Sequence, residues 1–580
     1  MHLSKREIDV GKANYQQATA DFSRRDFLKG GVAAGVVGGI GLGSIYFGYD
    51  RTIHDPVRLG IIGTGDEGGV LIGALNPDFV QVVALADIRP YNVHRAFYGD
   101  ESSDAALQAR PGLLAKYGWP NETIARRSVR VYEDGYEALL DDPNVEGVIV
   151  ALPLHLHAEA AIKAMRKGKH VLCEKLMGHN VAECKEMARV ARETGKLLAI
   201  GHQRHYSILY DNAAQSIRRG LIGDIHHIQA QWHRGNLPGS DSWQPPLPDV
   251  AMKKEIDRYQ KELARLESDL VNQLGRSGKA DPARLARRDA VVKTLRLRQA
   301  RMQDAQLAKD LKFLKKHGYE GFTVQGPGDQ TYKVDPIEEL IRWRLWNRTG
   351  GGLMAELGSH QLDAASIFIS SLREDGKKVH PLSVTAVGGR QLFPLDREVD
   401  DHVYCAFEFP GPEYDRDPNK KIVVTYSSIN GNGFGGYGET VMGTTGTLVV
   451  HRESDVLLYP AEGSATTNLK VAKSGGGPTL DTTESGGAVT ADRQSSEGPV
   501  SRGYTEEIEH WAWCIRNNPQ ENKPRCHPEV GLADAIIALT ANRAIARAER
   551  IEFHKDWFVV DSDATPEGTK PNTVQDRYKV

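Results

Sequence analysis

The sequence predicts an α/β protein with a doubly wound parallel sheet, followed by a second α/β domain whose sheet is open and mainly antiparallel. Three observations support this. A strand-like apolar run at residues 57–62 leads into a glycine-rich turn at residues 63–69. Apolar runs then alternate with helix-like segments up to about residue 205, which is typical of a parallel sheet. After residue 220, several strand-like runs follow without helices between them, which favours antiparallel pairing.

The glycine-rich turn indicates a dinucleotide site. Gly63, Gly65 and Gly68 have the G-x-G-x-x-G spacing just before a helix-like segment. In such a turn the first glycine permits a sharp bend, the second lets the backbone approach a pyrophosphate, and the third lets the helix pack on the strand. A second apolar run ends at Asp87, 19 residues after Gly68, where a ribose-binding acid is expected. We therefore predict a nucleotide domain over residues 56–205. Asp87 favours NAD because a carboxylate repels a 2′-phosphate, whereas Arg89 leaves NADP open.

The rest of the nucleotide domain follows the same alternation. Residues 145–152 form a buried-strand run that Pro153 ends, and a helix from about His157 stops at Gly168. Residues 170–175 and 197–201 are the next strands. The polar residues 202–205 then reach the edge of the cleft, where they either contact substrate hydroxyls or cap the join between the domains.

Composition limits the possible functions. The chain has 580 residues, of which 40% are apolar and 26% are charged, so it is globular with room for two domains and insertions. The net charge of −3 and the lack of a basic stripe argue against nucleic-acid binding. Five scattered cysteines without a C-x-x-C indicate neither a metal site nor a disulfide framework. Cys514 and Cys526 are near enough in sequence to pair in an oxidising compartment.

The amino terminus resembles an export signal. Residues 23–29, SRRDFLK, precede an uncharged, glycine-rich segment at 30–48, and together they resemble a twin-arginine signal. The length alone would allow a membrane anchor, but the glycines make the segment weakly hydrophobic. No A-x-A cleavage site follows, so both a periplasmic and an uncleaved, membrane-tethered form stay open. We expect residues 1–50 to take no part in the fold and the twin-arginine export machinery to be a partner.

The second domain is expected over residues 206–560, followed by a tail at 561–580. Its strand-like runs lie at residues 225–233, 382–387, 402–409, 422–429 and 439–450. An open sheet leaves one face for water or for another copy of the chain, so a homo-oligomer is expected. Residues 249–317 show a coiled-coil spacing broken at 275–282, which predicts an antiparallel helical hairpin. This hairpin is either a solvated protrusion or a subunit clasp or cleft lid. Residues 464–500 are rich in Gly, Ser and Thr and are predicted to be a mobile loop.

The segment at residues 350–363, GGGLMAELGSHQLD, carries candidate acid–base chemistry. On a helix, Glu356, His360 and Asp363 share one side. A histidine with a carboxylate one turn earlier can act as a general base, because the carboxylate orients the ring and stabilises its protonated form. The alternatives are a solvent-facing ion pair or a helical metal site, and the sequence offers no set of metal ligands for the latter.

Taken together, these motifs resemble the Gfo/Idh/MocA oxidoreductases. The shared features are the glycine turn, the acid that closes the second strand, LPLHLH at 152–157, GKHVLCEK at 168–175 and the segment at 350–363. The resemblance implies a Rossmann-type NAD(P)-binding domain and a second α/β domain whose sheet often mediates oligomers. It also implies that Pro153, His157 and Glu174 lie at the cofactor site.

The resemblance further assigns catalytic roles. Lys175, which follows Glu174, would lie at the nicotinamide and the reacting hydroxyl, and a fixed positive charge there lowers the cost of a developing alkoxide. His360 would be the acid–base group, assisted by Glu356. Two positions differ from the family pattern. Leu176 replaces the usual proline after the lysine, which suggests that a cis peptide bond is lost. Glu356 replaces the usual aspartate.

These features predict hydride transfer from a secondary hydroxyl of a sugar, cyclitol or glycoside to a bound nicotinamide. Because free NAD is not readily recycled outside the cytoplasm, export favours a tightly bound cofactor and a redox-neutral cycle. Two alternatives stay open. One is an NAD-retaining glycosidase that acts by transient oxidation of the sugar, and the other is a non-catalytic, NAD-bound sugar sensor.

Overall fold

A computed structural model describes residues 3–19, 42–248, 252–277, 279–461, 472–474, 477–479 and 502–571. Within these ranges, no helix is both long and apolar enough to cross a membrane. The twin-arginine motif at residues 23–29 and nearly all of the predicted loop at 464–500 lie outside the described residues.

The first domain contains a six-stranded parallel sheet with the strand order β3-β2-β1-β4-β5-β6. This is the Rossmann order, so the predicted doubly wound sheet is confirmed. The strands are β1 (Val57–Ile62), β2 (Val80–Ala86), β3 (Arg130–Tyr132), β4 (Gly147–Val150), β5 (His170–Glu174) and β6 (Leu198–Gly201). Their helices are α4 (Asp66–Ala74), α5 (Pro90–Tyr98), α6 (Asp104–Ala109), α7 (Gly112–Tyr117), α8 (Glu122–Ala125), α9 (Glu137–Leu140), α10 (His157–Arg166) and α11 (Val181–Thr194).

The second domain contains an eight-stranded sheet with the order β15-β14-β13-β7-β12-β11-β10-β18. Every neighbouring pair is antiparallel except β7 with β12, which is parallel, so the predicted open and mainly antiparallel sheet is confirmed. The strands are β7 (Ile225–Arg234), β10 (Ser383–Gly389), β11 (His402–Pro410), β12 (Lys421–Asn430), β13 (Tyr437–Gly443), β14 (Gly446–His451), β15 (Asp455–Pro460) and β18 (Ile551–Glu552). Helices α12 (Ile208–Arg218), α17 (Ser359–Ser370) and α19 (Pro528–Arg547) pack on one face.

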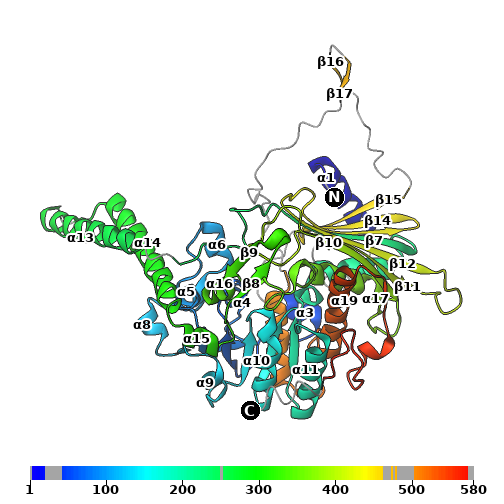
Figure 1. The fold of residues 1–580 in the computed structure, drawn as a ribbon, viewed down its shortest axis with the longest axis horizontal. Coiled ribbons are helices and arrows are strands. Elements are labelled where there is room, and N and C mark those ends of the chain that lie inside the picture. Colours follow the sequence, from blue (N-terminus) through cyan, green and yellow to red (C-terminus); the bar gives the residue numbers. More distant parts are fainter. Residues whose placement is uncertain are drawn as a thin grey trace.

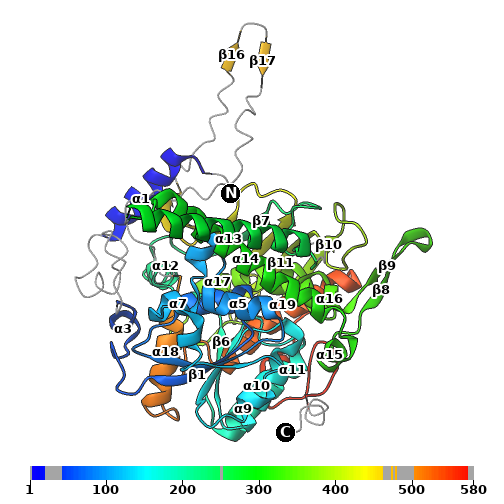
Figure 2. The same cartoon turned by 90° about the vertical axis from the view of Figure 1, so that its left-hand side faces the viewer.

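The two domains interlock through the last helices of the chain. After the second sheet, α18 (Tyr504–Arg516) returns to the first sheet, as Figure 2 shows beside β1. Its buried Trp511 packs against Gly147 of β4. Helix α19 lies between the two cores, with Ile536 in one and Ile537 in the other. Helices α18 and α19 therefore tie the two domains together.

The expectation that residues 1–50 take no part in the fold is wrong for the two described segments. Helix α1 (Lys5–Thr19) lies along the edge strand β15, where Lys12 pairs with Asp455 at 2.8 Å. Tyr15 is buried, and its hydroxyl is 3.1 Å from that of Ser216. After α3 (Leu42–Phe47), the Tyr49 hydroxyl donates to Glu509 at 2.6 Å. The edge strand offers a surface that a helix can cover, which explains the docking of α1.

The insertion forms a projecting helical pair with an anchored base. Helices α13 (Met252–Ser277) and α14 (Pro282–Leu307) lie side by side and extend away from the body, while α14 packs on α5 (Figure 1). The chain continues through α15 (Leu311–Lys316), β8 (Phe322–Gln325), β9 (Thr331–Val334) and α16 (Pro336–Ile341). At the other end of the chain, the Lys185 ammonium donates to the carbonyl oxygens of Ser562 and Ala564 at 2.9 and 2.7 Å, so the start of the predicted tail packs on α11.

Candidate functional site

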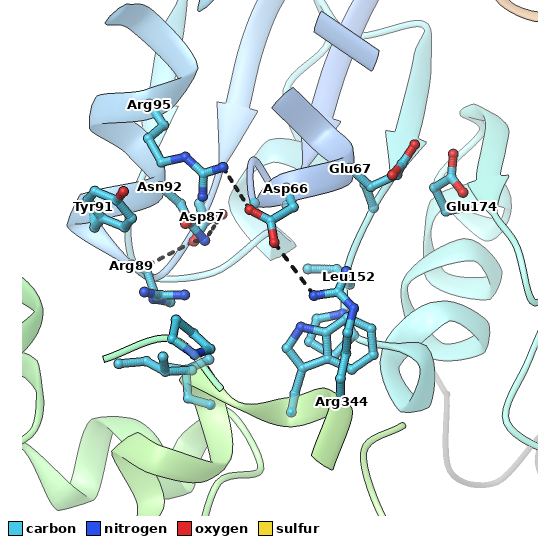
Figure 3. A pocket seen from close by; sticks show the side chains of 18 of the residues that line it. Asp66, Glu67, Asp87, Arg89, Tyr91, Asn92, Arg95, Leu152, Glu174 and Arg344 are labelled. Atoms are coloured by element: carbon cyan, nitrogen blue, oxygen red, sulfur yellow. Dashed lines mark hydrogen bonds and ion pairs between the residues drawn. The ribbon is translucent and has the colours of Figure 1, made fainter. Parts of the chain in front are cut away.

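A cleft of about 1100 Å³ lies where the carboxyl ends of the first sheet face the second domain. Its wall includes the turn after β1, the ends of β2 and β5, the loop after β4, helix α17 and the base of α14. Ligands of open α/β sheets bind at this edge. Figure 3 shows the nucleotide end of the cleft.

The three glycines of the turn have distinct surroundings. Gly63 has φ +86°, and a Cβ there would lie 2.5 Å from the carbonyl oxygen of Ala151. A Cβ on Gly68 would lie 2.2 Å from the carbonyl oxygen of Gly63. A Cβ on Gly65 would meet nothing closer than Asn92 Nδ2 at 3.7 Å. Gly65 therefore leaves the backbone open to an approaching ligand, and the turn fits a dinucleotide pyrophosphate.

An acidic residue at the turn forms ion pairs with arginines. Asp66, the first residue of α4, lies 2.7 Å from Arg95 Nη2 and 3.7 Å from Arg344 Nη1, as the dashed lines in Figure 3 show. Burial favours the neutral carboxyl, but Arg95, Arg344 and Arg110 together lower the pKa of Asp66. Although the Asp66 side chain is 46% exposed, its carboxylate links these arginines beside the expected phosphate position.

Asp87 and Arg89 directly follow β2, at the expected ribose position. One oxygen of Asp87 accepts from the Thr64 backbone N–H at 2.8 Å, and the other accepts from the Arg89 N–H at 2.8 Å. Burial raises the pKa of Asp87, and these hydrogen bonds oppose the effect. The Arg89 guanidinium turns to Asp304 of α14, with Nη2 at 2.9 Å and Nε at 3.1 Å from Oδ2. The sequence did not single out Asp304.

The base of α14 covers this end of the cleft. Asp304 also accepts from the Tyr91 backbone N–H at 3.1 Å, and the Arg301 guanidinium lies 5.2 Å from the centre of the Tyr91 ring. Next to them, Tyr319 is almost fully buried and lines the cleft. The hairpin was predicted to be either a solvated protrusion or a subunit clasp or cleft lid. Its base contacts the cleft, while the rest of the hairpin projects away from the body (Figure 1).

Lys175 and His360 come together in the other half of the cleft. Lys175 follows β5, and its ammonium donates to the carbonyl oxygen of Glu356 at 2.9 Å. His360 on α17 is 8% exposed and lines the same cleft. Burial and then the charge of Lys175 hold the pKa of His360 well below its usual range. The imidazole is therefore neutral near pH 7 and can accept a proton.

Glu356 does not orient His360 as the i, i+4 spacing predicted. Its carboxylate accepts from Arg344 Nε at 2.9 Å, and within the described ranges His360 Nδ1 has no hydrogen-bond partner. The reason is local, since residues Met354–Gly358 form a π-turn that changes the helical phase before His360. Burial opposes ionisation, but Arg344 and Lys175 lower the pKa of Glu356.

The turn after Lys175 keeps its cis geometry. The Lys175–Leu176 peptide bond is cis, so the predicted loss of this bond is wrong. Leu176 is buried, and its carbonyl oxygen lies 2.8 Å from His157 Nδ1, so packing and hydrogen bonding fix the turn without a proline ring. The other nitrogen of His157 lies 2.8 Å from the Leu152 carbonyl oxygen. His157 thus ties together two loops of the cleft wall, next to Pro153, which also lines it.

Glu174 lies deeper in the same wall. It is 4% exposed, and its Oε2 accepts from the Lys175 backbone N–H at 3.1 Å. Burial and then the charge of Glu67 raise the pKa of Glu174 well above its usual range. Figure 3 shows the carboxyl groups of Glu67 and Glu174 side by side.

Residues 57–202 match the model of the oxidoreductase family with an NAD-binding Rossmann fold, Gfo/Idh/MocA. This segment is a Gfo/Idh/MocA NAD-binding domain. Residues 21–41 match the model of the twin-arginine translocation signal, so the chain carries a signal for that export route.

Relatives share parts of the chain. A glycosyl hydrolase family 109 protein of Stenotrophomonas maltophilia is 33% identical over 175 residues, which cover 30% of this chain and 35% of the relative. A protein of the same name from Solibacter usitatus is 28% identical over 216 residues, covering 36% and 46%. The chain thus spans less than half the length of these relatives. The crystal structure of the aldose–aldose oxidoreductase from Caulobacter crescentus, complexed with glycerol, is 16% identical and covers 86% of this chain and 100% of that chain, with a TM-score of 0.47.

The polar residues 202–205, at the end of the Gfo/Idh/MocA segment, make contacts with the second domain. His205 Nε2 is 2.9 Å from Asp363, and Arg204 Nε is 2.8 Å from Glu453. None of residues 202–205 lines the cleft, so they serve the join between the domains. His202, Asp363 and Asp534 are close enough to hold a metal ion, but the Lys378 ammonium already pairs with both carboxylates.

The five cysteines are buried thiols, and Cys514 and Cys526 are not joined.

Sequence reasoning missed the residues beside His360. The Trp232 ring lies 5.6 Å from the His360 ring and stacks on Tyr437 at 4.7 Å between centroids. Arg234 lies two residues further along β7, and Arg502 also lines this half of the cleft. The alternation in residues 225–233 predicted a half-exposed strand, and that signal places Trp232 and Arg234 on one face. It does not show that this face meets the cofactor domain.

Proposed function

We propose that this chain is an NAD-dependent oxidoreductase that oxidises a secondary hydroxyl of a sugar, cyclitol or glycoside. The observation that carries this proposal is the meeting of Lys175 and His360, from two domains, in the cleft that begins at the glycine turn. When bound there, NAD would accept the hydride from the carbon that carries the hydroxyl.

The side chains supply the proton chemistry. Neutral His360 takes the proton of the hydroxyl as the C–H hydride leaves, and the carbon–oxygen bond becomes a carbonyl. The Lys175 ammonium, held by the carbonyl oxygen of Glu356, stabilises the negative charge that develops on the oxygen. Glu356 stays ionised against Arg344 and balances the local positive charge. A second sugar carbonyl would return the cofactor to its oxidised form.

The ribose end of the cleft supports NAD over NADP. A 2′-phosphate there would face the Asp87 carboxylate, and the guanidinium of Arg89 that could bind it is paired with Asp304. The Asp304 side chain is 3% exposed and that of Arg89 is 16% exposed, so the pair is well shielded from water. Arg89 is therefore unavailable for a phosphate unless α14 moves.

The same contacts support tight retention of the cofactor. The base of α14 lines the cleft beside Asp87 and docks on α5, and we propose that this docking slows the departure of an adenosine group. Retention suits a protein with a twin-arginine signal, since that route would deliver the folded chain with its cofactor. We place the mature chain in the periplasm or tethered to the membrane.

The open face of the second sheet is the proposed contact between copies of the chain. Val387 and Tyr404 are direct cross-strand neighbours on β10 and β11, and they are 62% and 44% exposed. Such paired apolar groups favour association. Tyr404→Asp should lower the mass measured by light scattering, and an unchanged mass would exclude this face.

The test of function starts with the cofactor. Purified full-length protein is denatured, and the released cofactor is identified by mass spectrometry. Candidate sugars are then added to the intact protein while absorbance is followed near 340 nm, roughly where reduced nicotinamide absorbs. We expect reduction of bound NAD that Lys175→Ala and His360→Ala abolish and that His226→Ala, on the exposed side of β7, preserves. A protein that holds no NAD would refute the proposal.

A second candidate function is supported by the family 109 relatives. An NAD-retaining glycosidase would oxidise a sugar hydroxyl transiently, eliminate the glycosidic bond and return the hydride. Cleavage of an aryl glycoside without accumulation of reduced cofactor would favour this reaction. A wild-type protein that holds NAD but turns over no sugar or glycoside would instead favour a sensor.

A further inference from the structure

Arg234 is a cation in the part of the cleft next to His360, and within the described ranges it has no carboxylate partner. It ends β7 on the same face as Trp232, and both line the cleft. Its guanidinium carbon lies 5.4 Å from the centre of the Trp232 ring. Among the residues that the structure describes, none forms a hydrogen bond or an ion pair with the Arg234 side chain.

The acids near Arg234 are already engaged. Glu356 accepts from Arg344 at 2.9 Å, and Asp241 pairs with the buried Arg397. Burial and then the charge of Arg344 lower the pKa of Arg234, and the charges of Glu356 and Asp241 oppose this only in part. A partly buried guanidinium without a counter-charge is costly, and a bound anion would remove that cost.

The cofactor's phosphates do not need Arg234. The turn before α4 is reached by Arg344, whose Nη1 lies 3.7 Å from Asp66. Arg502, which also lines the cleft, pairs with Glu453 at 2.7 Å. Arg234 is thus available to a ligand that occupies the region in front of β7.

Trp232 places this cation relative to the reacting group. Its ring centre lies 5.6 Å from the His360 ring and 5.4 Å from the Arg234 guanidinium carbon. Tyr437 stacks on it and fixes its plane. An aromatic face packs well against the C–H face of a sugar ring. A sugar that lies beside Trp232 with one hydroxyl at His360 can therefore direct another substituent to Arg234.

We infer that the substrate carries a carboxylate, as in a hexuronic acid or its glycoside, and that Arg234 binds that carboxylate. The inference rests on the proposed function for the position of the reacting hydroxyl. A guanidinium donates two parallel N–H groups to a carboxylate. Glu356 is already paired with Arg344, so the single charge of Arg234 matches a singly charged carboxylate.

Calorimetric titration of the full-length, NAD-loaded protein tests this. The probes are glucuronate, galacturonate and mannuronate, each compared with glucose, galactose or mannose. We expect at least one acid to bind roughly 10- to 100-fold more tightly than its neutral counterpart. Arg234→Gln should reduce that ratio to about 1, and Arg234→Lys should restore part of it. Arg218→Gln, an exposed change on α12, should leave it unchanged.

A wild-type ratio near 1, a ratio that survives Arg234→Gln, or no binding of any acid would overturn the inference. Absorbance near 340 nm, in roughly the range where reduced nicotinamide absorbs, separates this from the proposed function. If neutral sugars reduce the bound NAD and acids have no advantage, the oxidoreductase stands and the acid site falls. If an acid binds through Arg234 and bound NAD is never reduced, the acid site stands and the oxidoreductase falls.

Discussion

Substituting Asp304 by asparagine should loosen the cover over the cofactor. The Asp304 carboxylate holds Arg89 through two hydrogen bonds and the Tyr91 N–H through a third. Removing one partner of a buried ion pair costs about 3–5 kcal/mol, and the lower value applies because asparagine can still accept from Tyr91. The loss acts on the docking of α14 against α5. Since about 1.4 kcal/mol is a tenfold change, the undocked fraction should rise roughly 100-fold.

The assay is the rate at which bound NAD leaves the full-length protein, followed by rapid gel filtration and mass spectrometry. We expect Asp304→Asn to release NAD roughly 100-fold faster, and the freed Arg89 to lower the ratio of the NADP and NAD dissociation constants. Asp289→Asn is the matched control, because it lies on the same helix with its side chain 65% exposed. Release at the wild-type rate with an unchanged NADP preference would refute the reasoning.

Three further predictions follow from the site and the amino terminus. Neutral His360 is the proposed base, and its pKa lies below the ordinary value of about 6.5. We therefore expect kcat/KM to stay constant down to about pH 6.5 and to fall only at lower pH. A decrease in kcat/KM that begins at or above about pH 6.5 would contradict the assignment. Gly65→Ala should keep the wild-type Tm but lose at least about tenfold in NAD affinity, whereas Gly68→Ala should lower the Tm because its Cβ meets Gly63; equal effects would argue against the turn assignment. Deleting residues 1–19 should lower the Tm by at least about 3 °C, since α1 packs on β15, and an unchanged Tm would show that this docking is not stabilising.

The sequence predicted the elements whose signals are local. A sharp turn that needs φ +86° at Gly63, and an acid that directly ends a buried strand, are properties of short segments. The strand alternation of β11 and β12 likewise follows from one buried and one exposed face, so the second sheet could be predicted from periodicity. The positions of Lys175 and His360 in the cleft remain consistent with the resemblance that suggested them.

Tertiary structure decided what depends on residues far apart in the chain. Arg89 and Asp304 are 215 positions apart, and no local pattern reports that a helical insertion returns to the nucleotide site. The π-turn before His360 sends Glu356 to Arg344, although the spacing alone suggested a pair on one helical face. Arg234 became a candidate only when burial and the engagement of its neighbouring acids were known. Periodicity fixes which face of an element is buried, but the identity of the facing partner is set by the packing of the whole chain.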